Sequence, residues 1–548
     1  MSVYESSAPR GGGVAVAALL IAAVSVTGLF TRPLLAIDET RYAAVALDML
    51  QRGDWLVPHL NGAPYSHKPP LLFWLVILGW RVVGVHEAWA RLVGPIAGMI
   101  AVSLVAAMAR VLWLHDARTK SWAPVITASA LVWASYGSLL MFDTLLACGA
   151  LLALLGVVHG VEHNRKRGIV YIALGITIGI LAKGPVILIH VLPVALFAPW
   201  WATPRRDRRW IAWYAMLAGA VVLGAAGALL WAIPAGKAGG PEYQQAIFFG
   251  QTAGRMTKSF AHSRQLWWYL PLLPVLLFPW FVWPESWRAL RALRAAPRDA
   301  GVRFCLVSAA AALLLFSLIS GKQVHYLLPV TPVLALLLAR ALGQREAAML
   351  GRPWPVALVI SSVALAVIAA ALTTRAQAIL WWPHDPIAWW WALPPIGAAI
   401  MLLVWQRGWI TRNAAVHALA VSTVVLLCGV QLAAGRAGSV PYDTAPMAAA
   451  VKRALHDGHP VAMVGAYNGE YHFEGRLQDE RIDVVLPNDA AQWLREHASG
   501  LLLRYDRGRD AAVPAGVVAR HPFRNGWVTL SSAPPGTQTL SDPAGRTE

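Results

Sequence analysis

The sequence predicts an α-helical polytopic membrane protein, and its composition gives the first reasons. Of the 548 residues, 57% are hydrophobic and 14% are charged, whereas ordinary soluble domains carry roughly 25% charged residues. The mean hydropathy is +0.53, and the chain contains 27 tryptophans. So few charges cannot cover the surfaces of several soluble domains. Composition therefore excludes a soluble multidomain, a disordered or a collagenous chain.

Long apolar runs recur along the chain, separated by short joints that carry charges, prolines or glycines. A bilayer core requires about 20 apolar residues per helix, and on that criterion the chain contains about thirteen transmembrane helices. The expected spans lie near residues 13–31, 91–114, 121–141, 143–161, 168–182, 184–202, 210–234, 268–284, 303–320, 326–343, 353–373, 387–405 and 413–435. The first run looks like a signal peptide, but the many spans that follow favour a retained anchor.

The placement of the basic residues predicts the orientation of the chain. There are 46 Lys+Arg against 28 Asp+Glu, which gives a net charge of +18. Short basic joints follow the even-numbered spans, at residues 118–120, 165–167, 205–209, 288–298 and 407–412. Because Lys and Arg are retained in cytoplasmic loops, we expect the amino terminus inside and the carboxyl terminus outside. These joints explain much of the basic excess, so no nucleic-acid partner is needed.

Two domains are expected, a transmembrane domain over residues 1–435 and a small outward-facing α/β domain over residues 436–548. Charge density rises in the tail, and the patterns there predict helices over 445–455 and 489–497 and strands over 461–466, 482–486 and 501–505. Two outward loops of the first domain, 32–90 and 235–267, are longer than connectors need to be. Helices are expected within the first of them, over 39–51 and 69–83.

The first outward loop carries the most informative polar residues. Asp38 and Glu39 follow the first span directly, where a general base can meet a lipid-borne substrate at headgroup level. The alternative interpretation is helix capping, with Asp38 as cap and Glu39 in the first turn. Lys68 precedes two prolines and an apolar helix, which suits a phosphate-binding cation, although a lysine that snorkels to the interface fits the pattern as well.

Three other outward joints carry ionisable residues. Asp143 and Lys183 each stand alone in apolar surroundings, where an ionisable residue is a functional candidate by default. A structural ion pair between the two is the alternative. A third joint carries Lys322 and Tyr326, which can both donate to phosphate oxygens. Cations and carboxylates on one face of the membrane at four separate joints are stronger evidence than any one of them.

These segments resemble a known family. The runs DETRY, GDWLVPHLNGAPYSHKPPLLFW, FDTLLA, AKGP, FAHSRQLWWYLPLLP and GKQVHYLLP are similar, in this order, to bacterial lipid-linked sugar transferases of the GT-C type. Lipid A aminoarabinose transferases are the nearest named relatives, and protein O-mannosyltransferases are more distant ones. The resemblance covers roughly the first 345 residues, while the later spans and the tail agree in layout only. It implies a GT-C architecture.

The resemblance also implies roles for individual residues. It places Asp38 at the reaction centre with Arg41 in support, and it matches Asp143 to an acidic position of the second outward loop. It assigns the donor phosphate to Lys68, Lys183 and Tyr326, to which Lys322, Arg255 and Arg264 add positive charge. Together with His262, the two arginines lie on a loop that becomes ordered over bound donor in the family. In the tail, Glu470, His472 and Glu474 suggest an exposed strand or turn, and the tail domain as a whole is expected to serve acceptor docking or stability.

No cofactor motif is evident, and a divalent metal such as zinc is left open. His67 stands where aminoarabinose transferases often have a metal-holding Glu, so His67 and His262 are candidate zinc ligands. Two imidazoles supply only half of a tetrahedral shell, and solvated histidines are the alternative. Cys148, Cys305 and Cys428 lie singly in apolar runs, which gives neither a disulfide framework nor a metal-binding spacing.

The resemblance implies an inverting glycosyltransferase of the bacterial inner membrane. Its donor would be an undecaprenyl-phosphate sugar, and its acceptor lipid A or another glycan or lipid at the periplasmic face. A secondary transporter or lipid flippase is the alternative of another class, since many spans and buried charges suit one equally well. A non-catalytic membrane assembly protein is a further alternative. The candidate residues gather at one face without visible half-repeats, which disfavours transport.

Overall fold

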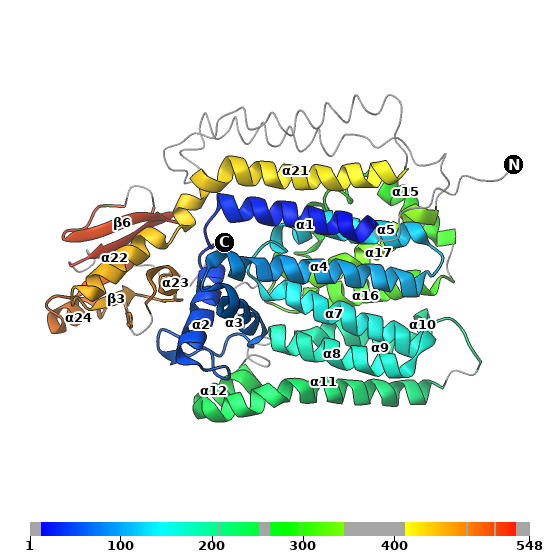
Figure 1. The fold of residues 1–548 in the computed structure, drawn as a ribbon, viewed down its shortest axis with the longest axis horizontal. Coiled ribbons are helices and arrows are strands. Elements are labelled where there is room, and N and C mark those ends of the chain that lie inside the picture. The colour runs from blue at the N-terminus through cyan, green and yellow to red at the C-terminus, as the bar shows by residue number, and fades with distance from the viewer. Residues whose placement is uncertain are drawn as a thin grey trace.

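The computed structural model describes residues 12–206, 209–250, 264–295, 298–344, 412–477, 480–508 and 511–532. Long helices lie side by side with roughly parallel axes, and a small domain with a β-sheet caps one end of them (Figure 1). Within these residues, eight helical segments are long and apolar enough to cross a membrane. They are Gly12–Thr31, Glu87–Leu112, Phe142–His163, Arg165–Leu196, Trp210–Phe249, Ala300–Leu318, Val324–Gln344 and Ala415–Leu432.

These segments confirm the predicted polytopic helical membrane fold. The helices behind them are α1 (Gly12–Thr31), α4 (Glu87–Leu112), α7 (Phe142–Val158), α8 (Arg165–Lys183), α9 (Ile187–Leu196), α11 (Trp210–Ala238), α16 (Ala300–Leu318), α17 (Thr331–Gln344) and α21 (Arg412–Ser439). Among the short turns within these segments, η1 (His159–His163) extends α7, and η2 (Gly184–Val186) separates α8 from α9. At η2 the chain turns through Gly184, whose φ of +76° favours glycine.

Two expected spans within the described residues do not form helical segments long enough to cross a membrane. The run 121–141 is divided at Ala130, whose extended backbone separates α5 (Ala117–Ser129) from α6 (Leu131–Tyr136). The run 268–284 contains only η4 (Leu270–Leu272) and α14 (Leu273–Leu276) before it turns. Its prolines remove backbone donors and break the helix repeatedly, which apolar content alone does not reveal. The expected spans 353–373 and 387–405 lie outside the described residues.

One end of the bundle carries the elements of the outward loops (Figure 1). The first loop forms α2 (Asp38–Arg52), α3 (Leu71–Val83) and a small hairpin of β1 (His59–Leu60) and β2 (Ala63–Pro64). The second begins as helix, because α11 leads into α12 (Gly240–Gln245) and η3 (Ala246–Gly250). A third segment at this end, η6 (Val324–Val330), leads into α17. The other end carries α10 (Ala198–Trp201), α15 (Pro284–Ala292) and η5 (Leu293–Ala295).

Within the described residues, the tail contains helices and a five-stranded sheet, where the sequence patterns indicated three strands. Its helices and turns are η9 (Val440–Tyr442), α22 (Ala445–His456), α23 (His472–Gly475) and α24 (Ala490–Glu496). Its strands are β3 (Val461–Val464), β4 (Asp483–Val485), β5 (Leu501–Arg507), β6 (Val517–Phe523) and β7 (Gly526–Ser531). They form one sheet in the order β4-β3-β5-β7-β6, in which β3 pairs in parallel with β4 and β5, and β7 pairs antiparallel with β5 and β6.

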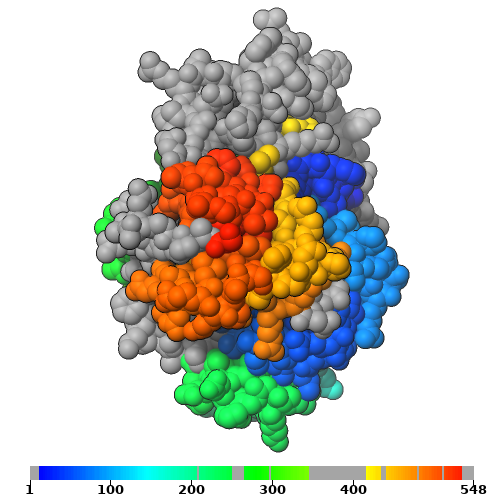
Figure 2. Space-filling model, turned by 90° about the vertical axis from the view of Figure 1, so that its left-hand side faces the viewer, coloured from blue at the N-terminus to red at the C-terminus, as the bar shows by residue number. Residues whose placement is uncertain are grey.

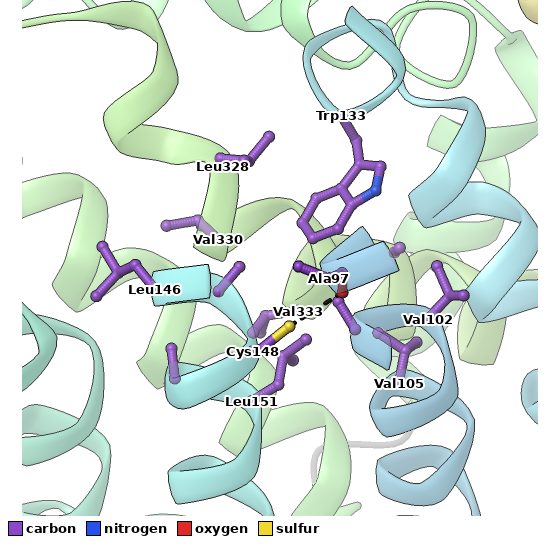
Figure 3. Close-up of a cluster of buried hydrophobic side chains, with 14 of the residues drawn as sticks. Ala97, Val102, Val105, Trp133, Leu146, Cys148, Leu151, Leu328, Val330 and Val333 are labelled. Carbon is purple, nitrogen blue, oxygen red and sulfur yellow. Dashed lines mark hydrogen bonds between the residues drawn. The ribbon is translucent and has the colours of Figure 1, made fainter. Parts of the chain in front are cut away.

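The buried core gives the end of the bundle that carries α2 and α3 a rigid base. Side chains of α4, α6, α7, η6 and α17 pack together, with the Trp133 ring above Leu146 and Val333 (Figure 3). The thiol of Cys148 donates to the carbonyl of Ala97 at 3.0 Å. Close packing of this kind limits the movement of the helix ends above it. The starts of α7 and η6, where Asp143 and Tyr326 lie, are therefore fixed relative to each other.

Candidate active site

Four segments far apart in the sequence bring their polar residues to the same end of the bundle. Asp38 begins α2, Asp143 lies in the first turn of α7, Lys183 ends α8, and Tyr326 lies in η6. Each lies where a helix begins or ends, so the chain can place a charge there without burying it in the middle of the apolar bundle. The expected convergence of the candidate residues is therefore present in the geometry.

Asp38 is the most accessible carboxylate of the group, with 52% of its side chain exposed. Its Oδ1 atom accepts hydrogen bonds from Nη2 of Arg41 and from the hydroxyl of Tyr42, the latter at 3.2 Å. Burial, and next the charge of Asp38, raise the pKa of Tyr42 well above its usual range, so the hydroxyl stays protonated and donates. The capping interpretation of Asp38 is wrong, since Ile37 is the cap residue and no side chain caps α2.

Glu39 has a structural environment, in contrast to its neighbour. Its side chain is 2% exposed and forms an ion pair with Arg32 at 2.5 Å. It also accepts from the backbone N–H of Leu35 at 2.9 Å and from that of Leu140 at 2.7 Å. Glu39 therefore joins the end of α1, the start of α2 and the segment before α7, which fixes Asp38 relative to Asp143.

A second group of charges lies beside the first. Nζ of Lys183 donates to Oδ1 of Asp143 at 2.6 Å, and Nε2 of His325 lies 3.9 Å from Oδ2 of the same carboxylate. The ammonium of Lys183 also lies 4.4 Å from the ring centre of Tyr326, which is a cation–π distance. The side chain of Asp143 is 3% exposed and that of Lys183 is 11% exposed. The ion pair between Asp143 and Lys183 is therefore present, and the rings of His325 and Tyr326 lie next to it.

Lys68 lies beside the start of α7. Its Nζ is 5.6 Å from the ring centre of Phe142, the residue before Asp143. The ring of Phe142 meets that of Tyr42 edge-on at 4.9 Å, so one aromatic contact joins α2 to the start of α7. His325 is close enough to Lys68, Asp143 and Asp38 for their charges to act on it. The two groups therefore share one electrostatic environment.

The structure gives Lys322 a different environment from the one expected. Its side chain is 2% exposed, and Nζ donates to the carbonyls of Ile319 at 2.6 Å and Arg264 at 3.0 Å. It thus closes the carboxyl end of α16 and holds the segment at Arg264 by a backbone contact. Arg264 is partly buried, and its own N–H donates to Ser320 at 3.1 Å. Arg255 and His262 lie outside the described residues, and His67 is exposed.

Sequence reasoning did not single out several residues that belong to this site. Tyr42 and His325 stand inside two of the quoted runs, DETRY and GKQVHYLLP, so the runs themselves were the available signal. Asn468 is another such residue, and its Oδ1 atom accepts a hydrogen bond from Nη1 of Arg41 at 3.3 Å. Its contact crosses from the tail to the first loop, and no local pattern predicts it. Tyr136, whose ring lies 5.6 Å from that of His325, is a further neighbour.

The tail contacts the site through buried polar residues, which corrects one expectation. Glu470 is 0% exposed and His472 is 7% exposed, and α23 begins at His472, so this is not an exposed strand or turn. Glu474 is partly buried as well. The small domain lies against the first loop when viewed from this end of the molecule (Figure 2). The neighbouring polar residues of the tail are therefore part of an interface.

Known proteins resemble this chain in sequence and in structure. Residues 67–231 match the family model described as dolichyl-phosphate-mannose-protein mannosyltransferase. An undecaprenyl phosphate-alpha-4-amino-4-deoxy-L-arabinose arabinosyl transferase of Pseudomonas aeruginosa is 33% identical over 319 residues, which are 56% of this chain and 55% of that protein. The crystal structure of ArnT from Cupriavidus metallidurans in the apo state superposes with a TM-score of 0.71 at 22% identity, covering 96% of this chain and 98% of that one. The fold is shared with ArnT.

A second ArnT structure supports the same conclusion. ArnT from Cupriavidus metallidurans bound to undecaprenyl phosphate superposes with a TM-score of 0.69, covering 95% of this chain and 98% of that one. The sequence resemblance to GT-C lipid-linked sugar transferases is confirmed, and the chain has their polytopic helical architecture. The sequence match spans about half the length of the curated ArnT-type relatives. ArnT resembles this chain in the tail as well, because the structural match extends over nearly the whole chain.

Proposed function

We propose that this protein is an integral-membrane glycosyltransferase that moves a sugar from an undecaprenyl-phosphate donor to an envelope acceptor such as lipid A. The observation that carries the proposal is the grouping of Asp38 and Arg41 with Lys68, Asp143 and Lys183 at one end of an apolar helical bundle. The relatives named as aminoarabinose transferases and the ArnT structure bound to undecaprenyl phosphate support this chemistry.

The lysines serve the leaving group in this proposal. Transfer breaks the bond between the anomeric carbon and the phosphate oxygen, so negative charge accumulates on the departing phosphate. Lys68 and Lys183 supply a positive field at that position, and a preorganised field acts most strongly where water is excluded. Tyr326 contacts the ammonium of Lys183 and can add a hydroxyl donor. Arg255 and Arg264 remain predicted contributors from the second outward loop.

Asp38 serves the acceptor or orients the sugar. If the acceptor is a hydroxyl, the exposed carboxylate of Asp38 takes its proton, while Arg41 and Tyr42 hold the carboxylate in place. If the acceptor is a phosphate of lipid A, its oxygen is already ionised, and Asp38 orients the sugar with Arg41. Attack from the face opposite the departing phosphate inverts the anomeric centre. Retention of configuration in the product would contradict this mechanism.

The location of the site follows from the proposed orientation. With basic joints in the cytoplasm, the end of the bundle that carries α2 and the small domain faces the periplasm of a bacterial inner membrane. About thirteen transmembrane helices and a periplasmic C-terminal domain belong to the same proposal. A lipid donor can then enter from the outer leaflet beside α3, which is apolar and lies next to Lys68. No observation favours transport over transfer.

The zinc site predicted from His67 and His262 stays a prediction, because His262 lies outside the described part of the chain. Among the residues described, no three His, Cys, Asp or Glu side chains come together as a metal site. The proposed mechanism uses only side chains of this chain.

Replacement of Asp38 by Asn tests the proposal. General-base catalysis contributes about 100- to 10,000-fold, so D38N is expected to lose transfer by that factor with a hydroxyl acceptor. The assay uses purified enzyme in vesicles with a radiolabelled polyprenyl-phosphate aminoarabinose donor and a glycolipid acceptor whose only nucleophiles are hydroxyl groups, and lipid A is assayed in parallel. The matched control is Asp48→Asn on the same helix, whose carboxylate pairs with Arg52 at 2.5 Å. Wild-type transfer by D38N would remove Asp38 from the mechanism.

A further inference from the structure

The small C-terminal domain reaches the proposed active site through one side chain. Arg41 binds Asp38 through Nη2 and donates through Nη1 to Oδ1 of Asn468 at 3.3 Å, across 427 positions of sequence. Its Nε atom has no hydrogen-bond partner within the residues that the structure describes. A guanidinium is planar and its donors form a rigid fork, so a contact at one end fixes where the other end points.

Asn468 is itself held by a buried carboxylate. Its backbone N–H donates to Oε2 of Glu470 at 2.9 Å, and its side-chain Nδ2 donates to Oε1 at 3.4 Å. Glu470 is 0% exposed. With Nδ2 directed at Glu470, the amide oxygen of Asn468 faces Arg41. Burial raises the pKa of Glu470, while the hydrogen bonds from Asn468 and the charge of Arg41 act in the opposite direction.

The loop that carries Asn468 is fitted to the first outward loop. The next residue, Gly469, has a φ of +77°, and a Cβ there would lie 2.4 Å from Cδ1 of Leu60. Nearby, Asn61 exchanges two hydrogen bonds with the backbone of Ile482, at 2.7 and 3.0 Å. These contacts fix the domain on the loop beside Arg41.

A second docking contact lies on α3, where the rings of Trp80 and Phe473 stack with centres 5.6 Å apart. Stacked rings of this kind add to the energy of an interface beyond the area they bury. Asn468 therefore approaches Arg41 from a docked domain and not from a free loop.

We propose that Asn468, held by Glu470, is a positioning residue that directs Arg41 onto Asp38, so that the C-terminal domain completes the active site. The inference rests on the proposed function for its catalytic meaning. Arg41 is 17% exposed and begins α2 together with Asp38, so without Asn468 one end of its fork would turn toward solvent. The carboxylate of Asp38 would then lose one of the two partners, Arg41 and Tyr42, that hold it during transfer.

The test removes the contact between Asn468 and Arg41 and then rebuilds it with the amide and the carboxylate at positions 468 and 470 exchanged. Asn468→Ala removes the acceptor for Arg41. The double variant Asn468→Asp with Glu470→Gln restores it, because the new carboxylate can accept from both Arg41 and the new amide while the summed charge is unchanged. Gln492→Ala is the matched control, since Gln492 and Glu496 form an exposed amide–carboxylate pair in the same domain at 2.8 Å. All variants are made in the full-length protein.

Two readouts are measured on each variant. In the vesicle transfer assay, N468A is expected to lower kcat about 10- to 100-fold, the range for a lost hydrogen bond to a charged group, with little change in KM for the donor. Hydrogen–deuterium exchange of the first turn of α2 is expected to accelerate in N468A. The double variant is expected to recover most of the kcat and the slow exchange, and Q492A to match the wild type in both.

The outcomes separate this inference from the proposed function. Wild-type kcat in N468A, or a double variant as slow as N468A, would overturn the positioning role. The positioning role would also be overturned if kcat and thermal stability fell together, and by the same amounts in the single and the double variant. If the wild-type protein transfers no sugar, the proposed function fails, and unchanged exchange of α2 in N468A would then overturn the contact itself.

Discussion

The two ends of the helical bundle use the same residue types in different ways. At the end that carries α15, Asp116 caps α5 by accepting from the backbone of Thr119, and Asp299 caps α16 by accepting from the backbone of Val302. Arg340 joins the two carboxylates, with hydrogen bonds of 2.7 Å to Asp116 and 2.9 Å to Asp299. The two carboxylates accept hydrogen bonds from backbone N–H groups at helix starts and pair with Arg340. Together these contacts hold α5, α16 and α17 in place.

At the other end, Asp38 caps no helix and keeps 52% of its side chain exposed. Asp143 and Lys183 are paired, yet His325, Tyr326 and Lys68 crowd around them. A structure that needed only stability would cap α2 with Asp38, as it caps α5 and α16 at the far end. The difference indicates that the charges at the end of the bundle with the proposed active site, the site end, are arranged for a ligand. Variants at both ends can test this.

The largest effect is expected from breaking the pair of Asp143 and Lys183. Lys183→Met leaves a buried carboxylate without its ammonium, which costs about 3 to 5 kcal/mol of unfolding free energy. The double variant Asp143→Asn with Lys183→Met removes both charges and should regain most of that stability, but not the transfer activity. Thermal unfolding in detergent and the vesicle assay measure the two quantities. A double variant that is both stable and active would make the pair purely structural, like the charges at the far end.

A smaller effect is expected from acidification of the site end, where the small domain contains a buried histidine. Burial lowers the pKa of His472 from 6.5 to about 4. The hydroxyl of Tyr467 lies 2.6 Å from its Nδ1 atom, and it can donate to the neutral ring in the tautomer that carries its proton on Nε2. The folded domain disfavours the charged form of His472. The contribution of this histidine to the free energy of unfolding is therefore fully present above pH 6.5, and about 3 kcal/mol of it is lost as the pH falls to 4.

His472→Gln keeps an acceptor for Tyr467 and removes this dependence. Burial raises the pKa of Glu470 and of Glu474, which stabilises the folded domain at low pH and opposes the histidine. The comparison is therefore between the wild type and H472Q at each pH. Hydrogen exchange of β3 and β5, corrected for the intrinsic rates, measures it between pH 4.5 and 7. Equal slopes for the two proteins would contradict the assignment.

The sequence predicted local elements of the site end closely and their contacts less well. The expected helices 39–51 and 69–83 correspond to α2 and α3, because apolar periodicity and proline mark them locally. Asp38, Lys68, Asp143 and Lys183 were grouped because the topology places helix ends on one side of the membrane. The contact of Asn468 with Arg41 could not be predicted, since nothing local relates residues so far apart.

The errors have physical reasons as well. Pro271, Pro274 and Pro279 make the apolar run 268–284 unsuitable for a continuous helix, although its hydropathy resembles that of a span. The sequence analysis does not indicate the strands β6 and β7, although Asn525 and Gly526 precede the alternating run 528–531 and are a typical hairpin signal. Glu470 was expected to be exposed because polarity predicts exposure, and only the docked domain explains its burial.

The far end of the bundle should respond to mutation in stability alone. Arg340→Gln removes charged hydrogen bonds to Asp116 and Asp299 and is expected to cost about 1.5 to 3 kcal/mol. Transfer per folded molecule should match the wild type, since the site lies at the other end. Arg118→Gln is the control, because Arg118 is exposed and, among the described residues, donates to the carbonyl of Gly343 alone, at 3.2 Å. A selective fall in kcat for R340Q would show that the two ends are coupled.

The smallest effect is expected for Lys322. This lysine lies at the same end as the proposed active site, but it has a structural role, like the charged residues at the far end. Lys322→Met loses two hydrogen bonds to the carbonyls of Ile319 and Arg264 and should cost about 0.5 to 1.5 kcal/mol for each. If Lys322 instead held the donor phosphate, kcat would fall by about 100- to 1,000-fold, as for the loss of a donor that stabilises developing charge. Lys68→Met supplies the comparison, since that larger fall is expected for it. Similar kcat values for K322M and K68M would contradict the division of roles between the two lysines.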